Sequence, residues 1–398
     1  MRNTLLRRAA VWATTVGLTS LGLLGAGVAP AQAAVSDCPQ GYFCGWANSD
    51  GTGSMFKTKT SMATLGTWDN KIRMRYNRTG STACLFDQPN YGLAGGYSWD
   101  TPAQSYPTNA GEHSELSSIK LVPTLRECEG KPYPYWEAAV APSAGGFGDM
   151  NGDRRADAML RDEAGRLWFM SGDGTGRMVG SGGWKAFDAL VRHGDFSRDG
   201  REDVIVREKA TGKLWLYPGT GSGGLAARTL IGSGGWNSMG RLAAFGDLSG
   251  DGRADLLAVE KATGKLWLYP GTSGGGLSAR KLIGSGGWNS MNALVGAGDM
   301  TGDGRADLVT REAATGKLWL YPGTSTRTLG ARKLIGTGGW NSIQHFFAVG
   351  DTSGDGRPDL QGAVYDHLYE YQGLAGGGLR KVDNYNYSWW ALDGATAF

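Results

Sequence analysis

The chain has 398 residues, room for two or three domains, and a formal net charge of +3 at pH 7. Three arginines among the first 34 residues, a stretch without acids, account for this charge, so the rest of the chain is formally neutral. A neutral chain lacks the basic field that attracts phosphate backbones, which argues against a nucleic-acid partner. The 67 glycines, with 15 tryptophans and 15 tyrosines, favour an all-β fold with many turns.

The first 34 residues have the pattern of a secretory signal peptide. Arg2, Arg7 and Arg8 form a basic start, an apolar stretch runs from residue 9 to 28, and Ala31-Gln32-Ala33 provides a small-residue cleavage site. We expect cleavage and an extracellular, secreted product, with an uncleaved membrane anchor as the alternative. Beyond this segment no apolar run is long enough to span a bilayer.

The four cysteines all lie in the first third of the chain, at Cys38, Cys44, Cys84 and Cys128. An even, clustered set in an exported chain predicts two disulfides. Three pairings are possible, and we favour Cys38–Cys44 with Cys84–Cys128 because partners that are close in sequence bond without rearranging the chain. Metal binding is disfavoured because the spacing contains no C-x-x-C pair.

Residues 35–122 contain two halves of similar plan, each with an aromatic residue followed six or seven positions later by glycine. This plan resembles the βγ-crystallin-like double Greek key. The strings CPQGYFCGW (38–46) and CLFDQPNYG (84–92) resemble peptidase inhibitor family I36 of actinobacteria. The resemblance implies inhibition of a secreted metalloprotease. The calcium motif of βγ-crystallins is incomplete in both halves, where Arg73-Met74 and His113-Ser114 replace the required serines and acids.

Residues 123–135 form a proline-bearing linker, and repeats occupy residues 136–398. An acidic ten-residue phrase recurs five times, with starts 46, 52, 52 and 52 residues apart, which is typical of a propeller or solenoid. The third repeat predicts four short antiparallel strands, the composition of one propeller blade. These strands are expected at 242–245, 255–259, 265–269 and 279–283.

The phrase GDLSGDGRADL (246–256) resembles the FG-GAP, or VCBS, repeats of integrin-α-type propellers. Such propellers have seven blades, whereas five repeats predict five. The ring would close if Trp136-Glu137-Ala138-Ala139-Val140 paired with the segment near Trp390; an incomplete ring is the alternative.

The acidic phrase places oxygen-bearing side chains at its positions 1, 3, 5 and 9, a pattern suited to a hard cation that takes six to eight oxygen ligands. Position 12 of the third copy is Ala258, so the bidentate glutamate of an EF-hand is missing. We predict structural calcium, weakest in the first copy, where Arg154 replaces the turn glycine; acidic turns without metal are the alternative. The candidate ligands are Asp149, Asn151, Asp153, Asp157, Asp195, Ser197, Asp199, Asp203, Asp247, Ser249, Asp251, Asp255, Asp299, Thr301, Asp303, Asp307, Asp351, Ser353, Asp355 and Asp359.

Tryptophans recur after two glycines at the end of the repeats. One hypothesis makes them sugar-stacking platforms with adjacent asparagines that bind hydroxyl groups, and repeated sites would bind a glycan polymer with avidity. The alternative is that they pack between blades. The residues concerned are Trp236, Asn237, Trp288, Asn289, Trp340 and Asn341.

No catalytic constellation accompanies these motifs. The strings at 271–275 and 219–224 match G-x-S-x-G and G-x-G-x-x-G, but neither precedes a predicted helix, and the four histidines have no metal-site spacing. We therefore expect a monomeric, secreted, non-enzymatic calcium-binding propeller protein that binds extracellular glycans or surface partners. The alternative is a protease inhibitor that acts through residues 35–122 and uses the propeller for targeting.

Overall fold

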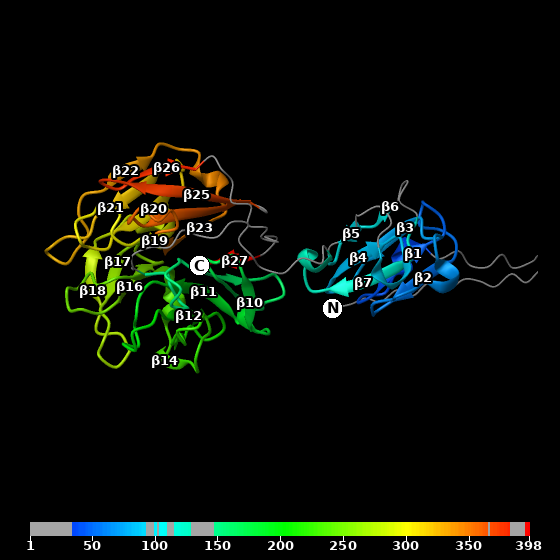
Figure 1. Cartoon of the computed structure of the whole chain (residues 1–398), viewed down its shortest axis with the longest axis horizontal. Coiled ribbons are helices and arrows are strands. Elements are labelled where there is room, and N and C mark those ends of the chain that lie inside the picture. Colours follow the sequence, from blue (N-terminus) through cyan, green and yellow to red (C-terminus); the bar gives the residue numbers. More distant parts are fainter. Residues whose placement is uncertain are drawn as a thin grey trace, which may run out of the picture.

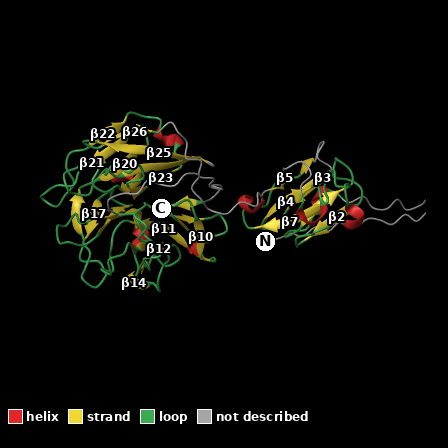
Figure 2. Cartoon of the chain, viewed as in Figure 1, coloured by secondary structure: helices red, strands yellow, loops and turns green. Residues whose placement is uncertain are grey.

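A computed structural model of the chain describes residues 34–92, 99–101, 103–109, 115–128, 147–364, 367–382 and 395–398. The predicted signal peptide up to residue 33, the linker residues 129–135 and the proposed closing segment 136–140 lie outside these ranges. The described residues form strands and short 3-10 helices, so the fold is all-β, as predicted (Figures 1 and 2). Within them no helix combines the length and apolar character needed to cross a membrane.

The short helices cap turns and connect strands. They are η1 (Val35–Asp37), η2 (Gly66–Trp68), η3 (Pro89–Tyr91), η4 (Leu125–Cys128), η5 (Trp184–Ala186), η6 (Trp236–Ser238), η7 (Trp288–Ser290) and η8 (Trp340–Ser342).

The N-terminal domain consists of two antiparallel sheets with strand orders β2-β1-β3-β6 and β5-β4-β7. The two halves exchange strands: Met62 of the first half bridges to Ile119 in the second sheet, and β6 of the second half pairs with β3 in the first. This reciprocal exchange produces the double Greek key that the sequence resembled. Its strands are β1 (Phe43–Trp46), β2 (Met55–Thr58), β3 (Met74–Asn77), β4 (Thr82–Phe86), β5 (Trp99–Thr101), β6 (Thr108–Asn109) and β7 (Ser118–Val122).

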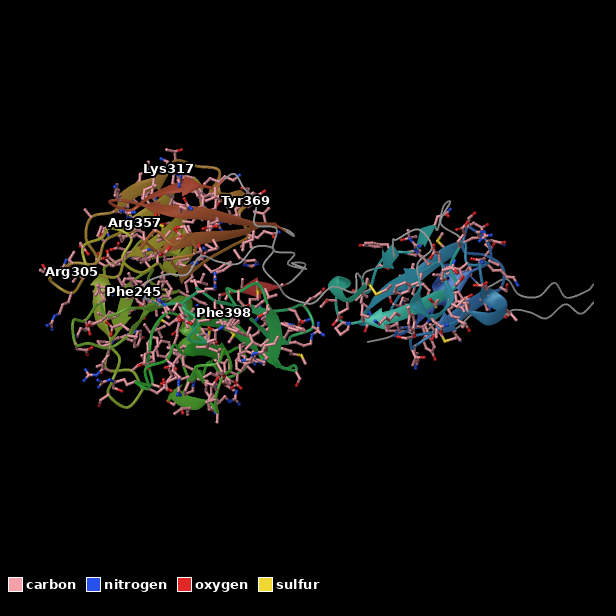
Figure 3. All side chains as sticks on the ribbon, in the orientation of Figure 1. Phe245, Arg305, Lys317, Arg357, Tyr369 and Phe398 are labelled. Atoms are coloured by element: carbon pink, nitrogen blue, oxygen red, sulfur yellow. A yellow bond between two sulfur atoms is a disulfide. The ribbon has the colours of Figure 1, made fainter. Side chains whose placement is uncertain are left out.

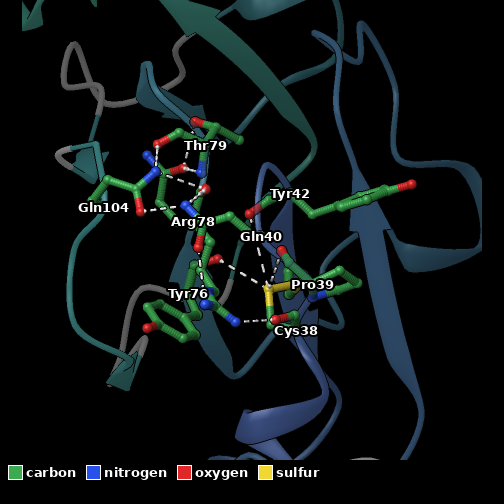
Figure 4. Close-up of a disulfide and its surroundings, with 10 residues drawn as sticks. Cys38, Pro39, Gln40, Tyr42, Tyr76, Arg78, Thr79 and Gln104 are labelled. Atoms are coloured by element: carbon green, nitrogen blue, oxygen red, sulfur yellow. Dashed lines mark hydrogen bonds between the residues drawn. A yellow bond between two sulfur atoms is a disulfide. The ribbon is translucent and has the colours of Figure 1, made fainter.

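Two disulfides attach terminal segments of this domain to the central strands β1 and β4. Cys38 bonds Cys44, and Cys84 bonds Cys128, which is the pairing that the sequence favoured. Near the first bridge, the Arg78 guanidinium donates hydrogen bonds to the Cys38 carbonyl oxygen and the Gln40 side chain (Figure 4). The second bridge attaches η4 to the centre of its sheet, because Cys84 lies on β4, between β5 and β7.

The repeat region contains one four-stranded antiparallel sheet for each acidic phrase within the described residues. We number these sheets 1 to 5 along the chain. Sheet 1 has β8 (Ala158–Arg161), β9 (Leu167–Met170), β10 (Gly176–Gly180) and β27 (Thr396–Ala397). Sheet 2 has β11 (Phe187–Arg192), β12 (Val204–Glu208), β13 (Leu214–Tyr217) and β14 (Thr229–Gly232). Sheet 3 has β15 (Met239–Phe245), β16 (Asp255–Glu260), β17 (Leu266–Tyr269) and β18 (Lys281–Gly284). Sheet 4 has β19 (Met291–Gly296), β20 (Leu308–Glu312), β21 (Leu318–Tyr321) and β22 (Lys333–Gly336). Sheet 5 has β23 (His345–Gly350), β24 (Asp359–Val364), β25 (His367–Leu374) and β26 (Gly378–Lys381).

The inner strands of the sheets, β27, β11, β15, β19 and β23, pack against one another around the axis of the ring (Figure 1). Their backbones come close together. A Cβ atom at Gly296 of β19 would lie 2.3 Å from the carbonyl oxygen of Ala244 on β15, so this position excludes every side chain.

The C-terminus supplies the inner strand of sheet 1 and thereby closes the ring. Thr396 and Ala397 pair with Arg161 and Leu160 of β8, and Phe398 exchanges two backbone hydrogen bonds with Met159. In the described residues closure therefore depends on the last four residues, further along the chain than the expected segment near Trp390, which lies outside the description. Joining the two ends of the repeat region in one sheet removes the exposed strand edge that an open ring would leave.

Candidate functional site

Each acidic phrase forms the loop that leads into the second strand of a sheet, and in sheets 2 to 5 the same loop follows the inner strand. In sheet 3, Asp247 follows β15 and Asp255 begins β16. Because all five loops lead into the equivalent strand, they lie at one end of the ring, which we call the acidic mouth. The loop tips reach solvent, and Arg305 extends outward from the loop of sheet 4 (Figure 3).

The aspartate at position 1 organises the winding of its own loop. Asp247 accepts backbone hydrogen bonds on Oδ1 from Gly250 (2.6 Å) and Asp251 (3.0 Å) and on Oδ2 from Gly252 (2.7 Å). Gly252 has a φ of +78°, a conformation that L side chains rarely adopt. Asp299 and Asp351 make the same three hydrogen bonds.

The aspartate at position 9 fastens the loop to the body of the sheet. Asp255 is fully buried; its Oδ2 accepts from the N–H groups of Leu248 and Ser249, and its Oδ1 accepts from Gly271, after β17. Burial raises the pKa of this carboxyl to about 6, against the effect of the backbone hydrogen bonds. Asp157, Asp203, Asp307 and Asp359 repeat the arrangement, with burial raising the pKa of Asp157 to about 7.

A cation fits these oxygens best in sheet 2. One carboxylate oxygen from each of Asp195, Asp199 and Asp203 lies within 4.8 Å of the other two. Two ligands at 2.3–2.6 Å from the same calcium ion are at most about 5 Å apart, so this triad has the dimensions of a cation site. Ser197 adds a hydroxyl beside both Asp195 and Asp203.

In sheets 2 to 5 the carboxylate at position 5 faces an arginine two residues later, and in sheet 2 the Asp199–Arg201 distance is 3.6 Å. The ion-pair distances are 2.9 Å for Asp251–Arg253, 3.3 Å for Asp303–Arg305 and 3.4 Å for Asp355–Arg357. A calcium ion in these loops would compete with the guanidinium group. The four loops share this ion pair, and it is longest in sheet 2, so competition with a cation is weakest there.

The acidic mouth encloses a cavity of about 940 Å³. Its wall comes from the loops of sheets 2 to 5, and the lining residues include the position-1 aspartates Asp195, Asp247, Asp299 and Asp351 and the arginines Arg198, Arg253 and Arg357. A concave site with many convergent polar groups and mixed charge suits a ligand that both donates and accepts hydrogen bonds.

His193, at the end of the cavity nearest the axis, is a residue whose position the sequence did not reveal. It is 5% exposed, its ring centre lies 3.9 Å from that of Phe147, and its Nδ1 has no hydrogen-bond partner among the described residues. The equivalent residues before the Gly-Asp of the other loops are apolar, at Phe245, Ala297 and Val349. In the sequence, a single histidine at a repeat position that is otherwise apolar is the signal that could have indicated its position.

The repeated tryptophans lie in the seams between sheets. The ring centres of Trp236 and Trp288 lie 4.5 and 4.8 Å from those of Tyr269 and Tyr321, and both indoles are at most 9% exposed. Trp340 packs on Tyr371 in the same way. The burial of Trp236 and Trp288 favours the alternative, packing between blades, because the neighbouring sheet covers these indoles.

The adjacent asparagines also bond the fold to itself. The Nδ2 of Asn237 donates to the Lys209 carbonyl oxygen at 3.0 Å, and that of Asn289 donates to Lys261 at 2.8 Å. Asn341 makes the equivalent bond to Ala313. Each amide thus ties a seam to the β-turn of the preceding sheet.

The position of His193 predicts a pH dependence. Burial and the nearby Arg192 lower the pKa of His193 from 6.5 to about 3. The unfolded chain therefore binds a proton on His193 at a higher pH than the folded chain. The contribution of neutral His193 to the free energy of unfolding is fully present above pH 6.5 and is lost as the pH falls towards 3. The variant His193→Phe, which copies Phe245 of sheet 3, should lose less stability on acidification than the unsubstituted protein. Urea unfolding in EDTA between pH 7.5 and 4 measures this difference; parallel pH profiles for the two proteins would contradict it.

Comparison with known proteins gives a family match for each of the two parts of the chain. The model of peptidase inhibitor family I36 matches residues 31–99, and the FG-GAP-like repeat model matches residues 195–258, 247–310 and 299–360. No curated protein matches the sequence.

Solved structures show distant likeness. An Agrocybe aegerita lectin, described as specifically recognising non-reducing terminal N-acetylglucosamine, is 16% identical over 90% of this chain and 95% of that chain, with a TM-score of 0.38. A luciferin-regenerating enzyme is 12% identical over 65% of this chain and 78% of that chain, with a TM-score of 0.33. These scores are too low to transfer any property of those proteins. The family matches and the sheet topology agree with each other: the chain joins a domain of peptidase inhibitor family I36 to a β-propeller of FG-GAP-like repeats.

Proposed function

We propose that the protein is an extracellular, non-catalytic binding protein whose calcium-stabilised propeller receives a glycan in the acidic mouth. The observation that carries the proposal is the polar cavity of about 940 Å³ formed by the loops of sheets 2 to 5. The two disulfides support an oxidising, extracellular compartment. The signal-peptide pattern of the first 34 residues supports the same location.

Calcium is the cation of this proposal. Asp195, Asp199 and Asp203 would hold it in sheet 2, with the Ser197 hydroxyl as a further oxygen. Bound calcium would supply positive charge that relieves the repulsion between three clustered carboxylates. The protein side chains keep the loop wound and, at position 9, join it to the rest of the sheet.

Calcium should stabilise the propeller. By mass action, about 2.7 kcal/mol of stabilisation is expected at a calcium concentration 100 times the dissociation constant. The variant Asp199→Asn, at the triad, should reduce the calcium-induced rise in melting temperature, whereas Asp69→Asn in the N-terminal domain should not. Thermal unfolding after EDTA treatment and calcium titration provides the measurement. A melting temperature that does not respond to calcium would remove the cation from the proposal.

A glycan is the ligand class that suits the acidic mouth. Sugar hydroxyls both donate and accept hydrogen bonds, and the wall of the cavity provides carboxylate acceptors beside guanidinium donors. Arg357 is well placed for this task because it lines the cavity while its side chain stays 43% exposed. This placement moves the proposed sugar site away from the tryptophan seams.

Two substitutions distinguish the mouth from the seams. Arg357→Ala should weaken glycan binding by the mature chain about tenfold, a typical cost for one charged contact. Asn289→Ala should leave the affinity unchanged because Asn289 bonds the backbone of a neighbouring turn. A glycan array with and without EDTA identifies the sugar, and titration of that sugar compares the variants. No binding on the array, or loss only in Asn289→Ala, would refute the mouth as the site.

Protease inhibition by the N-terminal domain is a second candidate function, supported by the family I36 match over residues 31–99. One exposed side chain favours it: Tyr106, just before β6, is 88% exposed. Tyrosines are enriched among the residues that dominate the energy of protein–protein interfaces. An exposed aromatic side chain on a disulfide-bonded domain would suit insertion into a pocket of a peptidase. In this function the propeller would act as the targeting module.

The inhibitor proposal predicts that the mature chain slows a secreted zinc metallopeptidase. Tyr106→Ala should raise the inhibition constant about tenfold or more if this side chain anchors the complex. Thr108→Ala, on an exposed neighbour in β6, is the matched control and should have little effect. Progress curves across a panel of metallopeptidases give the constants. Unchanged rates across the panel at micromolar protein would exclude this function.

A further inference from the structure

The end of the ring opposite the acidic mouth is lined by basic side chains. A cavity of about 400 Å³ opens there between the beginnings of the inner strands. We call it the basic mouth. Its basic lining residues are Arg161, Arg207, Arg241, Arg311 and His345.

Each sheet contributes one of these basic residues at the same level of the ring. In sheets 1, 2 and 4 the basic residue lies on the second strand, and its partners on the inner strand are Thr396, Ala189 and Ala293. In sheets 3 and 5 it lies on the inner strand, where Arg241 pairs with Val259 and His345 pairs with Ala363. A basic side chain recurs in every sheet, an arginine in sheets 1 to 4 and His345 in sheet 5, although the strand that carries it changes.

Three of these arginines have a structural role. Arg207 donates to the carbonyl oxygens of Trp236 and Met239, at the start of the next sheet. Arg311 bonds the start of sheet 5 in the same manner, and Arg161 donates to the carbonyl oxygen of Phe187 in sheet 2. These bonds use some of the five N–H groups on each guanidinium and leave its charge in place.

Arg241 is different, because its guanidinium group has no hydrogen-bond or ion-pair partner among the described residues. The second-strand position that holds Arg207 in sheet 2 and Arg311 in sheet 4 is occupied in sheet 3 by Val259. Burial lowers the pKa of Arg241, and no nearby acid offsets that effect. A partly buried cation without a counterion is costly in a folded protein, and it is the kind of group that an anionic ligand satisfies.

The surrounding groups neutralise little of this charge. Among the described residues that line the basic mouth, Asp188 is the acid, and it pairs with Arg207 at 2.7 Å. At the equivalent position of sheet 4 the partner of Arg311 is Asn292, which is neutral. Burial, with the charges of Arg161 and Arg311, lowers the pKa of His345, so its ring stays neutral near pH 7 and can donate a hydrogen bond.

Apolar side chains strengthen the field in this cavity. Leu190, Leu242, Leu294 and Phe346 line it together with the charged groups, and a deeper cavity of about 200 Å³ continues along the axis. Charges flanked by low-dielectric walls interact more strongly than charges on an open surface.

We propose that the basic mouth binds a small oxyanion, a sulfate or phosphate group, with Arg241 as its principal contact and with Arg207, Arg311 and Arg161 around it. The anion is either free or carried by a small ligand such as a sulfated sugar. This site is separate from the calcium loops, which lie at the other end of the ring, and it does not depend on the glycan proposed there.

Titration calorimetry on the full mature chain tests the site. Inorganic sulfate, inorganic phosphate, glucose 6-sulfate and glucose are compared at constant ionic strength in EDTA. We expect saturable binding of the oxyanions and none of glucose; tighter binding of glucose 6-sulfate than of sulfate would indicate a carried anion. EDTA should not reduce the affinity, so a failure of the calcium proposal is distinguishable from a failure here.

Three variants assign the binding to Arg241. Arg241→Gln should weaken sulfate binding at least about tenfold. Lys281→Gln, the same charge change on exposed β18 of the same sheet, should leave it unchanged. Asp188→Asn removes the lining acid and should tighten binding, a gain that misfolding would not produce. Absence of saturable binding, equal losses in Arg241→Gln and Lys281→Gln, or weaker binding by Asp188→Asn would overturn the proposal.

Discussion

Each propeller sheet depends on one buried carboxylate that receives hydrogen bonds from two separate pieces of backbone. Asp255 accepts from the loop that precedes β16 and from Gly271 after β17, and equivalent aspartates do so in the other four sheets. Burying this group without those bonds would cost several kcal/mol, so the loop and the turn must both be in place when the sheet forms. The remaining loop residues are held by the aspartate at position 1, as in the three backbone hydrogen bonds that Asp247 accepts.

The buried aspartate at position 9 explains why acidic side chains gather at one end of the ring. The loop that it holds leads into the second strand in every sheet, so five such loops converge on a single mouth. The opposite mouth collects the residues where the inner strands begin, and there each sheet places a basic side chain. The propeller thus has two chemically opposite ends along one axis, and a different class of ligand suits each.

The seams between sheets hold the ring together by apolar packing. In four seams of the described residues a tryptophan lies against a tyrosine, and the glycine four residues before it leaves room for the indole: a Cβ atom at Gly284 would lie 2.2 Å from Nε1 of Trp288. Because Trp236 and Trp288 are buried in their seams, we place the proposed glycan in the polar mouth instead.

The sequence by itself determined the all-β class, the repeat period and the four strands of the third repeat, and it favoured the disulfide pairing that the structure has. The first three features are local: alternation, turn glycines and recurring acids each act over a few residues. The sequence also predicted a cation at the acidic phrase, although it did not show that position 9 is a buried anchor or that, among the described loops, the triad around Asp199 is the one with the dimensions of a cation site. The tertiary structure decided which side chains meet across long separations. It buried Trp236 in a seam, placed His193 in a cavity, and joined Arg161 to Thr396, 235 residues away. It also left the Arg241 side chain without a partner among the described residues, because burial and pairing depend on neighbours that approach only when the ring closes.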